Sequence, residues 1–302
     1  MLTTSGDVKK FRAYFDITLA MFISGSAVVV SKMMVSSLPT FLATELGIFI
    51  GMLILLPLTF LVKKESIPLD GYTHAVLLAQ ALCGIVLYRI FTFIGLKYTS
   101  AATSGLITSA SPIMIVLLAY FILKEKLSLH HITGVIFVFI GLLTINLYTY
   151  FSSGAVDGSI KGNLLIMLAV ICEALFSILS KAKCKPISSL CRTTIIVFYA
   201  FMLLLPFAIH DATTYSISTV SLQNILCVLY YGVFVSFLSY LLWFKGIEKV
   251  SASHGAVFTS VVPVSSILLS AILLKENILP IHIISLIFII IGIWIACLDQ
   301  SK

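Results

Sequence analysis

The chain has 302 residues, of which 60% are hydrophobic and only 10% are charged. Its mean hydropathy of +1.14 is far above that of water-soluble proteins and excludes a soluble globular domain. Basic loops against an anionic membrane surface account for the formal net charge of +7, so no nucleic-acid partner is expected. The apolar stretches are too long and uniform for barrel strands, which predicts an all-α integral membrane protein with the lipid bilayer as partner.

Ten segments are long and apolar enough to cross a bilayer, which takes about 20 residues of helix. In chain order they are residues 14–34, 41–62, 72–93, 99–122, 130–150, 162–181, 190–209, 220–243, 251–274 and 279–298. The first span follows several basic residues, as in a signal peptide, but it is longer than an h-region and we expect it to be retained. The sequence therefore predicts ten transmembrane helices.

The lysines and arginines predict the orientation of these spans. With the N-terminus in the cytoplasm, 14 of the 19 basic residues fall on the cytoplasmic side. The positive-inside rule then predicts that both termini are cytoplasmic. The short loops favour a bacterial inner (plasma) membrane.

The second half of the chain repeats the first. Residues 93–146 align without a gap onto 244–297, and about 18 of the 54 positions are identical. Each repeat has five spans, so the second copy enters from the opposite side and the repeats are inverted. The predicted order is an N-terminal segment 1–13, a repeat 14–150, a linker 151–161, a repeat 162–298 and a C-terminal segment 299–302. Inverted repeats of this kind enclose a cavity near the membrane midplane that opens to alternate sides.

Ionisable side chains within a span are costly and are therefore candidate functional groups. Glu173 lies about 16 Å into the sixth span and shares one helical face with Ser177 and Ser180. Ser24 holds the equivalent position in the first repeat. A carboxyl here suits proton coupling or a cationic substrate group, whereas a protonated glutamate that holds a neighbouring helix is the structural alternative.

Arg89, beside Tyr88 in the third span, is the second candidate. Its planar guanidinium suits a carboxylate or a phosphate. Snorkelling to the outer surface and pairing with Glu45 are the structural alternatives. His254, near the start of the ninth span, is a candidate that titrates near neutral pH, or else a structural residue at a helix end.

The fourth and ninth spans carry prolines at matching positions, Pro112 and Pro263. Helices interrupted by proline in both repeats of a transporter point to its binding site. We therefore include Ser104 and Thr108 of the fourth span as candidate contacts, although small hydroxyl residues also serve helix packing.

Aromatic and basic residues complete the set of candidates. Tyr240 and Trp243 in the eighth span either stack on a substrate or lie in the aromatic belt at the membrane interface. Lys32 and Lys181 are repeat mates, expected to anchor helix ends or to pair in a gate.

Four features of the first half resemble the EamA domain of the drug/metabolite transporter superfamily. They are the motif LKYTSAATSG at the start of the fourth span, the proline in the middle of that span, its LKEKL end and the glycine-bearing fifth span. The second half repeats the pattern more loosely as GIEKVSASHGAVFTSVVPVSS. The resemblance covers about residues 14–298 and implies that spans 1, 3, 4, 6, 8 and 9 surround a cavity, with spans 5 and 10 peripheral. The chain departs from the pattern at residues 22–26, where relatives commonly carry Trp-Gly, and at Glu45, where they often carry arginine.

These features predict a secondary transporter that exports a small polar metabolite such as an amino acid by alternating access. Glu173 and Arg89 would hold the amine and the carboxylate of a zwitterion. An organic cation or drug, or a nucleotide-type metabolite moved by exchange, is the alternative cargo. An intramembrane enzyme acting on lipid, and a scaffold or receptor, are alternatives of other classes.

Enzyme signatures are absent from the sequence, which contains no HExxH, GxSxG, P-loop or dinucleotide fingerprint. Its six cysteines lack metal-ligand spacing, so we expect neither disulfides nor a metal site. No cofactor is expected, and the sequence leaves proton coupling and a homodimer open.

Overall fold

The computed structural model describes residues 5–35, 38–68, 70–99, 101–152, 159–182, 184–215, 221–273, 275 and 279–298. The expected N-terminal segment 1–13 lies partly outside the described residues, as does most of the linker 151–161, and the C-terminal segment 299–302 lies wholly outside them. Within the described part of the chain, every regular element is a helix. The prediction of an all-α membrane protein is confirmed.

The first repeat contains seven α-helices and two π-helical segments in its described residues. They are α1 (Ser5–Val35), α2 (Thr40–Leu56), η1 (Pro57–Val62), α3 (Gly71–Ala81), η2 (Leu82–Leu87), α4 (Tyr88–Leu96), α5 (Ala101–Thr108), α6 (Ser111–Leu123) and α7 (Leu129–Ser152). The second repeat follows the same plan. It consists of α8 (Ile160–Leu179), α9 (Ser189–Thr214), α10 (Leu222–Tyr230), η4 (Tyr231–Ser239), α11 (Tyr240–Ile247), α12 (Ala252–Phe258), α13 (Val261–Leu273) and α14 (Pro280–Cys297).

Nine continuous helical runs of the described residues are long and apolar enough to cross a membrane. The remaining predicted span, 99–122, consists of α5 and the shorter apolar helix α6. The ten predicted spans are therefore all present as helices. Most begin or end within a few residues of the predicted limits, but α1 begins at Ser5, well before residue 14.

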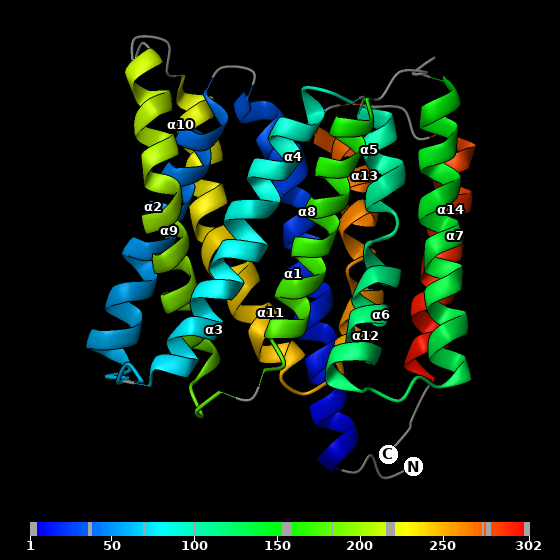
Figure 1. The fold of residues 1–302 in the computed structure, drawn as a ribbon, viewed down its shortest axis with the longest axis horizontal. Helices are drawn as coiled ribbons and strands as arrows, with labels where there is room; N and C mark the ends of the chain where they lie inside the picture. Colours follow the sequence, from blue (N-terminus) through cyan, green and yellow to red (C-terminus); the bar gives the residue numbers. More distant parts are fainter. Residues whose placement is uncertain are drawn as a thin grey trace.

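Successive spans alternate in direction, so the start of α1 and the end of α14 lie at the same end of the bundle (Figure 1). We call this the terminal end, and the opposite one the far end. α1 runs away from the terminal end, whereas α8, which begins the second repeat, runs towards it. This reversal is the inverted arrangement that an odd number of spans per repeat produces.

The fourth and ninth spans are interrupted near their prolines. α5 ends at Thr108 and α6 resumes at Ser111, directly before Pro112. α12 and α13 are separated in the same way, two residues before Pro263. Proline has no N–H to donate and its ring clashes with the preceding turn, which explains breaks at matching positions.

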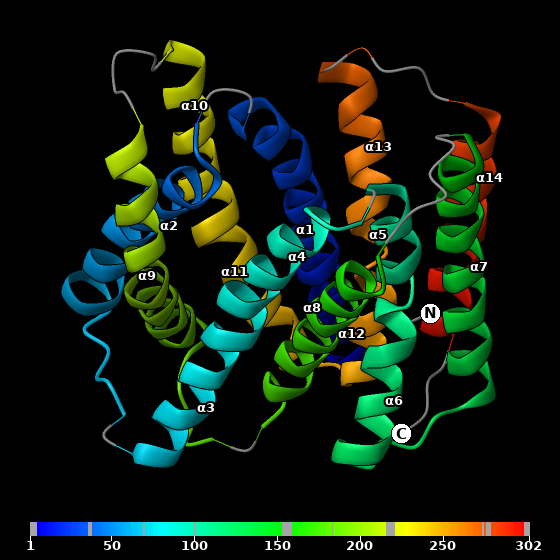
Figure 2. The same ribbon diagram turned by 45° about the horizontal axis from the view of Figure 1, so that its top comes forward.

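α7 and α14 pack side by side at the edge of the bundle (Figure 2). A Cβ added at Gly134 would lie 2.7 Å from the carbonyl oxygen of Gly292, and one added at Gly292 would lie 2.6 Å from the carbonyl oxygen of Gly134. Helix backbones approach this closely in membranes only where side chains are very small. The two glycines therefore fix the contact between the last helices of the two repeats.

Gly292→Ala is expected to lower the free energy of unfolding by about 1–3 kcal/mol, because α7 and α14 must separate to admit a methyl group. Thermal unfolding of the protein in detergent measures this loss. Gly71→Ala is the matched control, because a Cβ at Gly71 meets no atom within 4 Å. Equal melting temperatures for the two variants would contradict the packing role of Gly292.

Candidate functional site

A cavity of about 480 Å³ lies between the two repeats. Along α1 its lining runs from Met21 to Met34, and it includes Thr40 at the start of α2. These residues lead towards the far end of the bundle, so the cavity extends towards that end. Its volume falls in the range of sites for small molecules, about 300–1,000 Å³.

The lining comes from α1, α2, η2, α4, α8, η4, α11, α13 and the break after α12. The resemblance implied that span 4 belongs to this ring. Instead, in the described part of the chain, α5 and α6 contribute no lining residue, and α2 contributes Thr40, Ala43 and Thr44. α6 contacts one residue of the lining, Glu173, through the hydroxyl of Ser111.

Glu173 faces the cavity from α8 together with Phe176 and Ser177. Its Oε2 atom accepts a hydrogen bond of 2.6 Å from the hydroxyl of Ser111, the first residue of α6. The interrupted fourth span of the first repeat thus binds the carboxyl group of Glu173 in the second repeat. Ser180, expected on the same polar face, is buried outside the lining.

Arg89 faces the cavity from α4, directly after the π-helical segment η2. It donates hydrogen bonds to the hydroxyl of Thr44, at 3.0 Å, and to that of Tyr231. Its guanidinium carbon also lies 5.7 Å from the centre of the Tyr231 ring. Among the described residues it forms no ion pair with Glu45, so the pairing considered from the sequence is not seen here.

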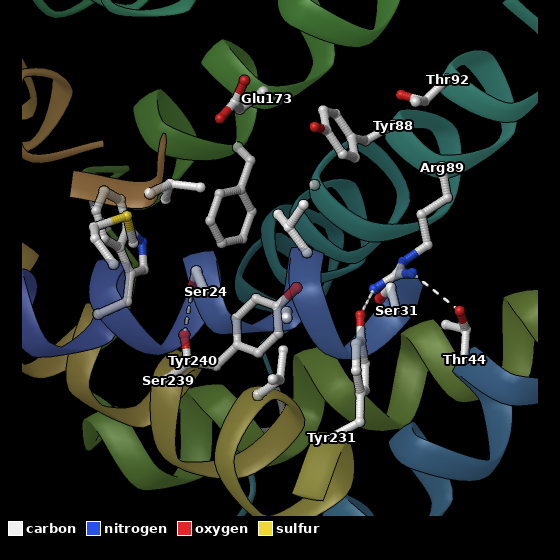
Figure 3. A pocket seen from close by; sticks show the side chains of 18 of the residues that line it. Ser24, Ser31, Thr44, Tyr88, Arg89, Thr92, Glu173, Tyr231, Ser239 and Tyr240 are labelled. Atoms are coloured by element: carbon white, nitrogen blue, oxygen red, sulfur yellow. Dashed lines mark hydrogen bonds between the residues drawn. The ribbon is translucent and has the colours of Figure 1, made fainter. Parts of the chain in front are cut away.

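The two charged groups face the cavity from different helices, with aromatic side chains nearby (Figure 3). Tyr88 lies within electrostatic range of both Glu173 and Arg89. Tyr240 and Trp243 also line the cavity. The indole N–H of Trp243 is buried and has no hydrogen-bond partner in the described part of the protein.

The charges are not duplicated between the repeats. At the offset of 149 residues Glu173 corresponds to Ser24, and at the offset of 151 Arg89 corresponds to Tyr240. Ser24 instead bonds Ser239 on the neighbouring element η4, with 2.8 Å between their hydroxyl oxygens. The cavity therefore presents one acidic and one basic group at positions that are not related by the repeat.

Several predicted residues lie away from the cavity lining. They are Ser104, Thr108, His254, Pro112, Pro263 and Lys181. His254 is held at the terminal end, with its Nδ1 atom 2.6 Å from the hydroxyl of Ser251 and its ring centre 4.6 Å from that of His131. The side chain of Lys32 lies outside the described residues.

Sequence reasoning missed much of the lining, including Thr44, Phe176 and Ser239. Signals were available for two of these three residues. Ser239 is the repeat mate of Tyr88 at the offset of 151, and Phe176 lies less than one turn after Glu173.

Glu125 joins the two repeats at the terminal end. Its carboxylate accepts hydrogen bonds from the backbone N–H groups of Ala252, at 2.8 Å, and Ser253, at 3.1 Å, and from the Ser253 hydroxyl. Lys124 before it has a left-handed backbone with φ of 54°, and its repeat mate Lys275 also has a left-handed backbone, with φ of 55°. The turn directs Glu125 onto the first residues of α12.

A second set of polar contacts lies at the same end. The Lys181 ammonium donates to the carbonyl of Ile247 at 2.6 Å. Arg192 donates to the carbonyl of Ser180 at 3.0 Å and lies 4.0 Å from the carboxylate of Glu248. Together with Glu125, these contacts close the bundle beneath the cavity.

The EamA-like transporter family matches residues 12–147 and 160–298, which are the two repeats. The chain is 36% identical over 297 residues to the uncharacterized transporter YetK of Bacillus subtilis, with 97% of this chain and 89% of that protein covered. It is 27% identical over 299 residues to an uncharacterized transporter of Archaeoglobus fulgidus, with coverage of 96% and 87%.

The fold also resembles that of a protein of known crystal structure. The TM-score is 0.77 at 18% sequence identity, and the match covers 95% of this chain and 98% of the other. At this level of identity the similarity concerns the fold alone.

Proposed function

This chain belongs to the EamA-like transporter family, and from that premise we propose that it exports a small polar metabolite such as an amino acid by alternating access. The proposal is supported by the cavity between the repeats, which extends towards the far end, and by the hydrogen bonds of Glu125 that join the repeats at the terminal end. With the terminal end in the cytoplasm of a bacterial cell, as the basic residues favour, this arrangement is the outward-open state.

The charged groups support a zwitterionic cargo. The Arg89 guanidinium has five N–H donors in a planar fork, and its bonds to Thr44 and Tyr231 leave donors free to bind a carboxylate. Glu173 is the acceptor for an ammonium group. The rings of Tyr88, Tyr240 and Trp243 would enclose the apolar part of such a molecule.

Glu173 also supplies a means of coupling. A carboxylate in the membrane interior that loses the substrate ammonium gains stability from binding a proton instead. Proton and ammonium therefore compete for one group, which exchanges an inward-moving proton for an outward-moving substrate. This competition is the coupling that we propose.

Transport into proteoliposomes tests the proposal. In vesicles whose lumen is more acidic than the medium, protons that leave through the protein should drive labelled amino acids into the lumen. The amino acids should not accumulate when an uncoupler removes the proton gradient. An amino-acid flux that does not change with the proton gradient would contradict proton exchange. Absence of flux for the whole amino-acid set would contradict the substrate class.

Arg89→Gln is expected to weaken amino-acid binding by about 10–100-fold, because a charge-assisted pair with the carboxylate is lost. Binding is measured by thermal shift and by competition against a labelled amino acid. Ser104→Ala is the matched control, since Ser104 is buried outside the cavity lining. Similar affinities for both variants would rule out the carboxylate site.

An organic cation is the second candidate cargo, favoured by the aromatic rings beside Glu173. The rings of Phe176 and Trp243 are stacked with centres 6.4 Å apart, and both residues line the cavity. Such rings attract a cation through their faces. Cation transport that survives Arg89→Gln and is lost in Glu173→Gln would favour this cargo over a zwitterion.

A further inference from the structure

Glu45 on α2 is an acidic side chain buried inside a membrane-spanning helix. It is 5% exposed, and neither carboxylate oxygen has a hydrogen-bond partner among the described residues. It lies five residues after Thr40, about 7.5 Å along the helix from the far end. An ionised carboxylate without hydrogen bonds or an ion pair is strongly disfavoured in such a place. The neutral acid avoids this cost.

Arg89 is within reach of this carboxyl group. Its Nη1 atom donates to Thr44, the residue that precedes Glu45. Thr44 faces the cavity, whereas Glu45 is turned about 100° around the helix and is not part of the lining. A void of about 10 Å³ borders Arg89 on the side of Ile48 and Tyr231.

We infer that Glu45 is a proton-binding site that competes with the substrate carboxylate for Arg89. When Glu45 is protonated, Arg89 stays on Thr44 and Tyr231, and its other donors serve the cavity. When Glu45 is ionised, charge attraction draws the guanidinium towards it, and the carboxylate subsite weakens. The inference rests on the proposed function, because it takes Arg89 to be the group that receives a carboxylate.

Among the described residues, the other ionisable groups around this carboxyl do not provide a competing cation. α9 brings Asp211, whose carboxylate already accepts a hydrogen bond from the backbone at the start of α2. η4 and α10 bring the phenols of Tyr231 and Tyr230. Within the described part of the protein Arg89 is the cation that acts on the group, and the side chain of Lys32 on α1 lies outside that part.

The competition has a definite pH dependence. Ionised Glu45 and a bound carboxylate compete for the same Arg89 guanidinium, so a bound carboxylate favours the protonated form of Glu45. By linkage, protonation of Glu45 raises the affinity for the carboxylate by the same factor. Affinity for a carboxylate should therefore fall as the pH rises through the titration of Glu45. If one proton binds with each ligand, the affinity changes by about tenfold for each pH unit.

The experiment uses 3-phenylpropionate, which has a carboxylate and no amine, and therefore does not need Glu173. Trp243 reports binding by its fluorescence once Trp294, the other tryptophan and 63% exposed on α14, is replaced by phenylalanine. Affinity is measured from mildly acidic to mildly alkaline pH in this background. Glu45→Gln is compared with Glu65→Gln, which changes a carboxyl group at the terminal end.

We expect the affinity of the background protein and of Glu65→Gln to fall by about tenfold per pH unit above the titration range, and that of Glu45→Gln to stay constant. A pH indicator should record uptake of about one proton per bound ligand, and none in Glu45→Gln. Glu45→Asp, which keeps a titrating group, should retain the pH dependence.

The outcomes separate the two proposals. If 3-phenylpropionate binds with the same pH dependence in Glu45→Gln, or without pH dependence in the background protein, the role of Glu45 is overturned and the carboxylate site stands. If neither 3-phenylpropionate nor phenylalanine binds at any pH, the carboxylate site falls, and the role of Glu45 falls with it. If Glu45→Gln no longer unfolds cooperatively, Glu45→Asp is compared with the background protein instead. An affinity of Glu45→Asp for 3-phenylpropionate that does not change with pH then overturns the inference.

Discussion

Replacing Glu173 by glutamine is expected to abolish proton-driven exchange without disturbing the fold. Glutamine has the same shape, and its side-chain oxygen can still accept the hydrogen bond that Ser111 donates to Glu173 at 2.6 Å. What is lost is the negative charge and the ability to hold a proton. A charge-assisted contact contributes about 1.5–3 kcal/mol, so affinity for an ammonium group should fall by about 10–150-fold.

Two measurements check this expectation. Amino-acid exchange in proteoliposomes should lose its response to an imposed proton gradient in Glu173→Gln, and binding should no longer depend on pH through this group. Ser177→Ala is the control, because Ser177 lines the same cavity one turn away and its hydroxyl bonds the backbone carbonyl of Glu173 at 3.3 Å. A variant that exchanges substrate with the wild-type response to the gradient would remove Glu173 from the coupling step.

Replacing Glu125 by alanine is expected to open the terminal end. The carboxylate accepts hydrogen bonds from the amides of Ala252 and Ser253 and from the Ser253 hydroxyl, so its removal leaves donors at the start of α12 without this acceptor. A loss of about 3 kcal/mol would shift the balance between the two open states by roughly 100-fold.

Amide hydrogen exchange is the direct readout of this change. The amides of Ala252 and Ser253 should exchange faster in Glu125→Ala, and access of water-soluble reagents to the cavity from the terminal end should rise. Lys126→Ala is the control, because Lys126 is exposed one residue further along the same loop. Unchanged protection of the two amides would show that Glu125 does not hold the terminal end closed.

The architecture could be predicted from the sequence because two strong patterns agree. The ten apolar segments and the internal repeat at the offset of 151 residues fix the number, order and inversion of the helices. The prolines also predicted where the fourth and ninth spans would break. These patterns depend on length and periodicity along the chain, which are visible without coordinates.

The lining of the cavity was harder to predict, because it depends on how each helix is rotated about its axis. Thr44 gave no signal of its own, yet it bonds Arg89, while the more conspicuous Glu45 faces away from the cavity. Ser104 and Thr108 carry the hydroxyl groups expected of a lining and lie outside it. The rotation is set by backbone contacts such as Gly25 on α1, where a Cβ would lie 2.4 Å from the carbonyl of Val262 on α13.

The π-helical segments η2 and η4 add a rotation that a regular α-helical pattern does not anticipate. At the offset of 151 residues, 82–87 of η2 correspond to 233–238 within η4, so the third and eighth spans are distorted alike. A π turn amounts to one extra residue in an α-helix. If η2 became a regular α-helix at its full length, everything after it would therefore turn by about 100°. Arg89 would then leave the cavity although no residue of its lining had been substituted, which makes the π distortion of this span, as well as its composition, a condition for function.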